Sequence, residues 1–115
     1  MVQKTDKVIR LIKRYVSELE KNKIRVKKAI LFGSYAQGRA VAESDIDVAL
    51  ISDAFSGDRF EDRQKIVPLR RGIDNRIEPI PFRPEDFDDG GILAQEIRKT
   101  GVPISLKGKR GEEEE

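Results

Sequence analysis

The segments ILFGS at residues 30–34 and DIDVALI at residues 45–51 decide the fold of this chain. The first is an apolar run that ends in a Gly-Ser turn, and the second opens with two aspartates before it becomes apolar. Ten residues, most of them small or polar, connect the two segments. Short apolar runs bounded by turn residues are typical of buried strands. We therefore predict a first strand over 25–32, a short helix over 34–38 and a second strand over 45–52.

The two aspartates form a candidate metal site. Asp45 and Asp47 are two positions apart, and side chains alternate along a strand, so both should project from one face. Two carboxylates held side by side suit a hard divalent cation such as Mg²⁺. The Gly33-Ser34 turn should offer backbone N–H groups at a helix start, which favours a phosphate. A phosphate cradle beside a metal site indicates nucleoside triphosphate chemistry.

This arrangement resembles a known family. The pattern Gly33-Ser34, ten residues, Asp45-x-Asp47 resembles the signature of the DNA polymerase beta nucleotidyltransferase superfamily. The surrounding LFGSYAQG and SDIDV look like its minimal nucleotidyltransferase branch. The resemblance implies an α/β fold, with a small mixed β-sheet and helices packed mainly on one face. It also implies Mg²⁺-dependent transfer of a nucleoside monophosphate, with AMP from ATP favoured, to a hydroxyl.

The resemblance implies a third carboxylate, on a neighbouring strand after the intervening helix. Glu78 is the best match, because it is the only acid in the third apolar stretch, residues 76–82. Asp74, four residues earlier, is the alternative. With Asp45 and Asp47, the third acid would help to hold two Mg²⁺ ions during catalysis and would accept the proton of the attacking hydroxyl.

The connection after the first strand supplies the candidate nucleotide contacts. Gly33 permits a close backbone approach that a Cβ would hinder. Ser34 would bond a β- or γ-phosphate oxygen through its hydroxyl and its N–H. Arg39 either meets a phosphate or lies in solvent. For Tyr35 we expect packing rather than base stacking.

The remaining elements follow from periodicity and turn residues. An amphipathic helix is expected over 5–22, and its basic side is a possible docking surface around Arg10, Lys13 and Arg14. Asp58 should cap a helix over 59–71, which Pro68 kinks or ends early. Pro79 and Pro81 cannot donate ladder hydrogen bonds, which predicts that the third strand is an edge. Last come a helix that begins at Pro84, a helix over 92–100 and a short strand over 102–106.

Composition limits the domain count and the chemistry. The chain has 115 residues, and Lys and Arg number 23 against 21 Asp and Glu, a net charge of +2. We expect a single domain over 1–107 and a charged tail over 108–115. The absence of Cys and His excludes thiolate metal sites and imidazole catalysis. No long apolar N-terminal stretch is present, so we expect a cytoplasmic protein.

Two classes of function remain open. A chain this short can form the triphosphate site but has little left for a second substrate pocket. Minimal nucleotidyltransferases are commonly paired with a helical HEPN-domain ribonuclease toxin. The resemblance therefore implies an antitoxin that adenylylates a tyrosine of that partner. The alternative is a non-catalytic binding module that neutralises the partner by contact alone. An antibiotic-modifying enzyme is disfavoured, because such enzymes usually carry a further substrate-binding domain.

Overall fold

The computed structural model describes residues 4–106, so the predicted tail over 108–115 lies outside the described residues. The elements are, in chain order, α1 (Lys4–Lys21), β1 (Lys28–Phe32), β2 (Ile46–Ile51), α2 (Arg59–Ile66), the 3₁₀ helix η1 (Val67–Arg70), β3 (Ile77–Phe82), α3 (Pro84–Asp89), α4 (Gly91–Thr100) and β4 (Val102–Ile104). The strands form one sheet in the order β3-β2-β1-β4. β1 is antiparallel to β2 and β4, whereas β2 and β3 are parallel. The predicted α/β fold with a small mixed sheet is confirmed.

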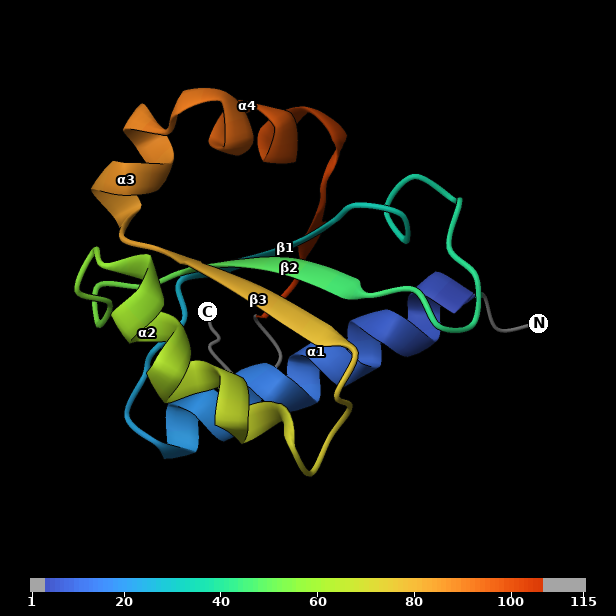
Figure 1. Cartoon of the computed structure of the whole chain (residues 1–115), viewed down its shortest axis with the longest axis horizontal. Coiled ribbons are helices and arrows are strands. Elements are labelled where there is room, and N and C mark those ends of the chain that lie inside the picture. Colours follow the sequence, from blue (N-terminus) through green and yellow to red (C-terminus); the bar gives the residue numbers. More distant parts are fainter. Residues whose placement is uncertain (1–3, 107–115) are drawn as a thin grey trace.

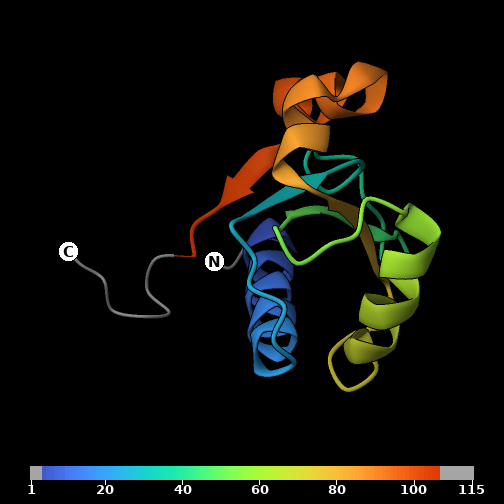
Figure 2. The same cartoon turned by 90° about the vertical axis from the view of Figure 1, so that its left-hand side faces the viewer.

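Helices cover the sheet in two layers of unequal size (Figures 1 and 2). Helices α1 and α2, the latter continued by η1, pack on one face, and α3 and α4 pack on the other. Along β2 the side chains alternate between the two cores. Val48 and Leu50 belong to the α1 side, whereas Ala49 and Ile51 belong to the side of α3 and α4. The continuous apolar run of β2 is therefore explained by burial on both faces.

The amphipathic helix of the N-terminal segment is confirmed within about one residue at each end. Its apolar stripe is buried against the sheet: Val8, Ile12, Tyr15, Val16 and Leu19. The Tyr15 hydroxyl donates a 2.6 Å hydrogen bond to the carbonyl of Ile66, which ties α1 to the end of α2. The basic side chains of Arg10, Lys13 and Arg14 are exposed.

Two local predictions were wrong. Residues 34–38 form consecutive turns instead of a helix, with the Arg39 N–H bonded to the Ser34 carbonyl at 2.9 Å. Five residues that end in a glycine with φ +73 are too few to repay helix nucleation. The strands are also shorter than predicted: β1 begins at Lys28, β2 at Ile46 and β4 ends at Ile104. Asp45 therefore precedes its strand rather than opening it.

The turn and cap residues behave as predicted. Asp58 accepts a 3.1 Å hydrogen bond from the Glu61 N–H and caps α2. Pro68 coincides with the change from α-helix to the 3₁₀ helix η1. β3, with its two prolines, is an edge strand.

Within residues 4–106, no helix is long and apolar enough to cross a membrane.

Candidate active site

The topology brings the predicted site residues to one end of the sheet. β1 ends at this end and β2 and β3 begin there, because β1 is antiparallel to β2 and β2 is parallel to β3. Asp47 is in register with Phe32 on one side and with Glu78 on the other. Registered partners project from the same face of a sheet. Asp47 and Glu78 are therefore neighbours. Gly33 directly follows β1 and Asp45 directly precedes β2, at the same end of the sheet.

Gly33 makes room for the Asp47 carboxylate. Its φ is +77, a conformation that side chains other than glycine's rarely adopt, and a Cβ there would lie 2.2 Å from Asp47 Oδ2. The close approach predicted at this glycine is confirmed, and the group that approaches is the Asp47 carboxylate. The turn that carries Gly33 and Ser34 begins directly beside this carboxylate.

The electrostatics at Asp47 fit a cation. Its carboxyl is half-buried, and its pKa is raised to about 6, first by burial and then by the negative charges of Asp45 and Glu78. These acids are therefore close enough to repel one another, and a bound divalent cation would relieve that repulsion. Oxygen ligands of this kind suit Mg²⁺. Among residues 4–106, however, no three acidic side chains are already gathered as a metal cluster.

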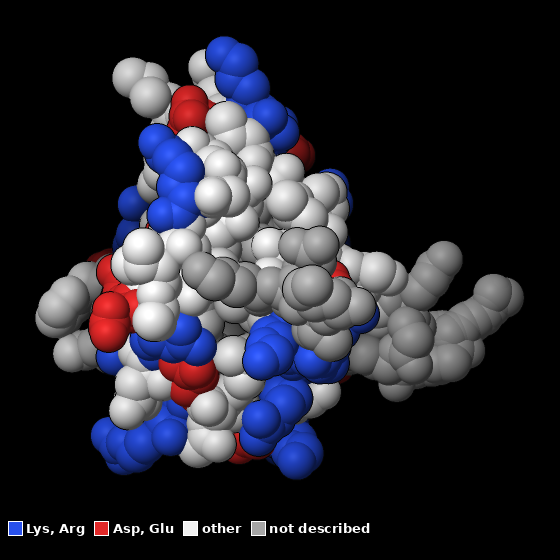
Figure 3. Space-filling model, turned by 90° about the vertical axis from the view of Figure 1, so that its right-hand side faces the viewer, with Lys and Arg blue, Asp and Glu red and all other residues white. Residues whose placement is uncertain are grey.

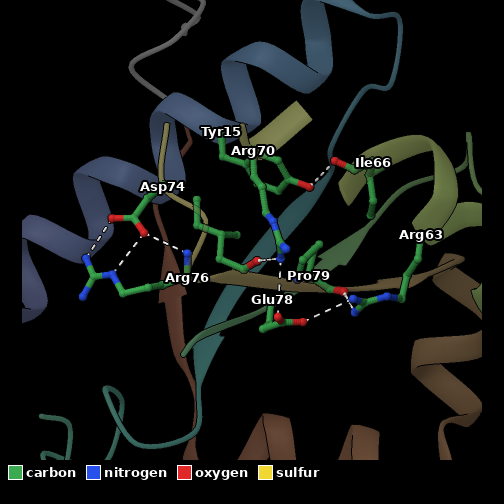
Figure 4. Close-up of polar contacts among 9 residues, drawn as sticks. Tyr15, Arg63, Ile66, Arg70, Asp74, Arg76, Glu78 and Pro79 are labelled. Carbon is green, nitrogen blue, oxygen red and sulfur yellow. Dashed lines mark hydrogen bonds and ion pairs between the residues drawn. The ribbon is translucent and has the colours of Figure 1, made fainter. Parts of the chain in front are cut away.

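Glu78 faces two arginines, Arg63 from α2 and Arg70 from η1 (Figure 4). Its carboxylate accepts hydrogen bonds from Arg63 Nη2 at 3.2 Å and from Arg70 Nη1 at 3.4 Å. The same guanidinium groups also donate to backbone carbonyls of β3, those of Pro79 at 2.8 Å and Ile77 at 2.7 Å. These contacts explain why Glu78 does not converge on the two aspartates in this structure.

Asp74, the alternative third acid, is bound elsewhere. Arg76 donates to it from Nε at 3.0 Å, from Nη2 at 2.8 Å and from its backbone N–H at 2.8 Å. These bonds from Arg76 lower the pKa of the Asp74 carboxyl, which lies in the turn before β3. Of the two candidates, only Glu78 is in register with Asp47.

Arg39 and Tyr35 differ in exposure. Arg39 is exposed and donates to the Gln37 side chain at 2.7 Å. Tyr35 is only 5% exposed and its hydroxyl accepts a 2.9 Å hydrogen bond from Arg76, which confirms packing for this ring. The contacts of Arg63 and Arg70 with Glu78 were not predicted. Their only signal is a spacing of seven residues, which places both on one side of a continuous helical segment.

The surface at this end of the sheet carries both signs of charge. Figure 3 views the molecule from the side on which the connection between β1 and β2 lies, and it shows basic and acidic side chains interspersed over the lower half. A mixed surface of this kind does not by itself indicate a polyanionic partner.

Known proteins resemble this chain in sequence and in fold. Residues 9–99 match the nucleotidyltransferase domain family, and the chain belongs to that family. Over 43 residues it is 51% identical to a Methanocaldococcus jannaschii protein named "putative protein adenylyltransferase", a match that spans 36% of this chain and 43% of that relative.

Two solved structures are also similar. One, titled a "putative nucleotidyltransferase" from Sulfolobus solfataricus, is 21% identical with a TM-score of 0.63 and covers 91% of this chain and 86% of its own. The other, a toxin-antitoxin solved with AMP-PNP, is 24% identical with a TM-score of 0.54 and covers 81% of this chain and 72% of its own. At these identities the structural likeness shows a shared fold.

The close approach at Gly33 leads to a prediction with a matched control. Gly33→Ala should destabilise the chain by about 2 kcal/mol and weaken ATP binding, because the new methyl group adds backbone strain and displaces the Asp47 carboxylate. Gly38→Ala is the control, since Gly38 also has a positive φ, +73, but a Cβ there meets nothing within 4 Å. Thermal unfolding and calorimetric ATP titration measure both effects. Equal losses in the two variants would show that the contact with Asp47 does not matter.

The raised pKa of Asp47 predicts a pH-dependent stability difference. For a carboxyl whose folded pKa lies above its unfolded value, ionisation opposes folding at high pH, and that cost disappears as pH falls through the folded pKa of about 6 towards 3.8. Asp47→Asn should therefore stabilise the chain at pH 7.5 by about 1 kcal/mol, allowing for solvent screening, with the gain fading by about pH 4. Denaturant unfolding at several pH values tests this. Asp88→Asn, at an exposed position of α3, is the control.

Proposed function

We propose that this chain is a Mg²⁺-dependent nucleotidyltransferase that transfers AMP from ATP to a hydroxyl group of a partner protein. The main support for the proposal is the position of the Asp47 carboxylate, which packs against Gly33. The pKa of this carboxyl is raised by burial and by neighbouring acids. Membership of the nucleotidyltransferase domain family supports the reaction class.

Each site residue has a role in this proposal. Asp45 and Asp47 would hold the cation, and Glu78 would complete the site and accept the proton of the attacking hydroxyl. The N–H groups of the turn at Gly33-Ser34 and the Ser34 hydroxyl would bind the terminal phosphates. When bound, Mg²⁺ would offset the charge of the triphosphate and activate the attacking oxygen. A bond forms from the acceptor oxygen to the α-phosphorus, the bond to the β-phosphate oxygen breaks, and pyrophosphate leaves.

For the acceptor we propose a tyrosine of a HEPN-domain toxin, with this chain as the antitoxin. Two comparisons support a protein acceptor in a toxin-antitoxin pair: a relative named a "putative protein adenylyltransferase" and a structural neighbour described as a toxin-antitoxin with AMP-PNP. The HEPN domain and the tyrosine follow from the resemblance to minimal nucleotidyltransferases. Co-expression with the neighbouring gene product, followed by intact-mass analysis of the partner, tests it. Addition of one or more AMP units, lost with Asp45→Asn, supports the enzyme. An unmodified partner that forms no complex contradicts this choice of acceptor.

One observation favours a second candidate function, that of a non-catalytic binding module. The third acid, Glu78, is engaged by two arginines instead of converging with the aspartates. A binding module that neutralises its partner by contact alone would not need Glu78 to be free. In the co-expression experiment this alternative predicts a stable complex with no added mass, and Asp45→Asn would leave that complex unchanged.

A further inference from the structure

Arg63 and Arg70 form a paired contact with the free edge of β3. Each guanidinium bonds both a backbone carbonyl of the strand and one oxygen of the Glu78 carboxylate (Figure 4). The two arginine side chains are only 35% and 23% exposed. An edge strand presents unpaired carbonyls, and these two donors satisfy part of that edge.

The distances show which of these bonds anchors the arginines. The bonds to the carbonyls of Pro79 and Ile77 are 2.8 and 2.7 Å, whereas those to Glu78 are 3.2 and 3.4 Å. Well-formed charge-assisted hydrogen bonds are usually about 2.7–2.9 Å long. The arginines are thus fixed mainly by the backbone of β3, and the Glu78 carboxylate is the more loosely held partner.

Asp47 lies on the other side of Glu78. The two acids are in register on adjacent parallel strands and repel each other. Without a cation, the favourable position for the Glu78 carboxylate is against the guanidiniums. With a cation between the acids, the favourable position for the Glu78 carboxylate is beside the cation and Asp47. The strand need not move, because the arginines can stay bonded to its carbonyls.

We propose that Arg63 and Arg70 are positioning residues that hold Glu78 away from Asp45 and Asp47 until the Glu78 carboxylate binds a divalent cation. The proposal rests on the function proposed above, since it assumes that the acids bind metal. It follows that metal binding at this site must break two ion pairs, so the arginines set the cation concentration at which the site fills.

The test is calorimetric titration of the nucleotide-free full chain with Mg²⁺. Arg63→Gln/Arg70→Gln should bind Mg²⁺ about three- to tenfold more tightly than the wild type, because partly exposed ion pairs are weak individually. Glutamine keeps an N–H donor for the carbonyls of β3. Arg83→Gln is the control: Arg83 pairs with Asp86 on α3 at 2.7 Å and should leave Mg²⁺ affinity unchanged.

A second background separates release of Glu78 from a general charge effect. In Glu78→Gln, the same arginine substitutions should no longer tighten Mg²⁺ binding. An equal gain in both backgrounds, or no gain in the wild-type background, overturns the proposal. If the double variant does not fold by circular dichroism, Arg63→Gln alone completes the cycle. Asp45→Asn separates the two ideas: if it leaves Mg²⁺ binding unchanged, the metal site itself is wrong.

Discussion

Asp47→Asn is expected to abolish Mg²⁺-dependent ATP binding and to reduce nucleotidyl transfer by about 100-fold or more, with the fold intact. The expectation follows from where this carboxylate lies. It packs against Gly33, adjoins Glu78 and takes no part in the apolar cores. Asparagine has the same shape but cannot offer the negative charge that a divalent cation requires. Asp45→Asn should behave in the same way.

Calorimetric titration with ATP, with and without Mg²⁺, measures the loss. Asp53→Asn is a suitable control, since it removes one negative charge from an exposed residue paired with Lys27 at 3.1 Å, outside the proposed site. ATP affinity that survives in both Asp45→Asn and Asp47→Asn would refute the metal assignment.

Glu78→Gln is expected to lower transfer by about 100-fold or more while leaving ATP binding nearly unchanged. The reason is that the proposed function assigns Glu78 to the attacking hydroxyl, whereas it assigns Asp45 and Asp47 to nucleotide binding through the metal. Glutamine keeps one oxygen that can accept from Arg63 or Arg70, and both arginines keep their bonds to the backbone carbonyls of β3, so β3 should keep its place. Transfer rates and ATP affinity, measured on the same preparation, separate the two effects.

Asp74→Asn is the matched comparison for Glu78→Gln. Asp74 is held by Arg76 and should not affect transfer directly. If Asp74→Asn, and not Glu78→Gln, lowers transfer, then Asp74 is the third acid. Activity retained in both variants would mean that the chain uses two acids or is not an enzyme.

The parts of the fold that could be predicted are those fixed by short-range pattern. The period of the apolar residues predicted α1, and the unbroken apolar run of β2 predicted a buried strand. Pro79 and Pro81 identified the edge strand. The error at residues 34–38 has a local cause as well, because five residues make too few hydrogen bonds to offset the cost of helix nucleation.

The candidate site could be predicted only in part. The spacing of Gly33, Asp45 and Asp47 indicated which residues meet, and the structure shows how closely Gly33 and Asp47 do. The partners of Glu78 could not be read from the sequence, because Arg63 and Arg70 come from a helical segment that packs beside β3 only in the folded chain. Arg76, which lies two residues before Glu78 in the sequence, binds Asp74.

Transfer of a nucleoside monophosphate by this site can be tested with two labelled forms of ATP. The chain is incubated with Mg²⁺ and the neighbouring gene product, with ATP labelled at either the α- or the γ-phosphate. We expect that the α-label enters the partner protein, that the γ-label does not, and that Asp47→Asn prevents the incorporation. Incorporation of the γ-label, or of the α-label at the wild-type level in Asp47→Asn, would contradict this expectation.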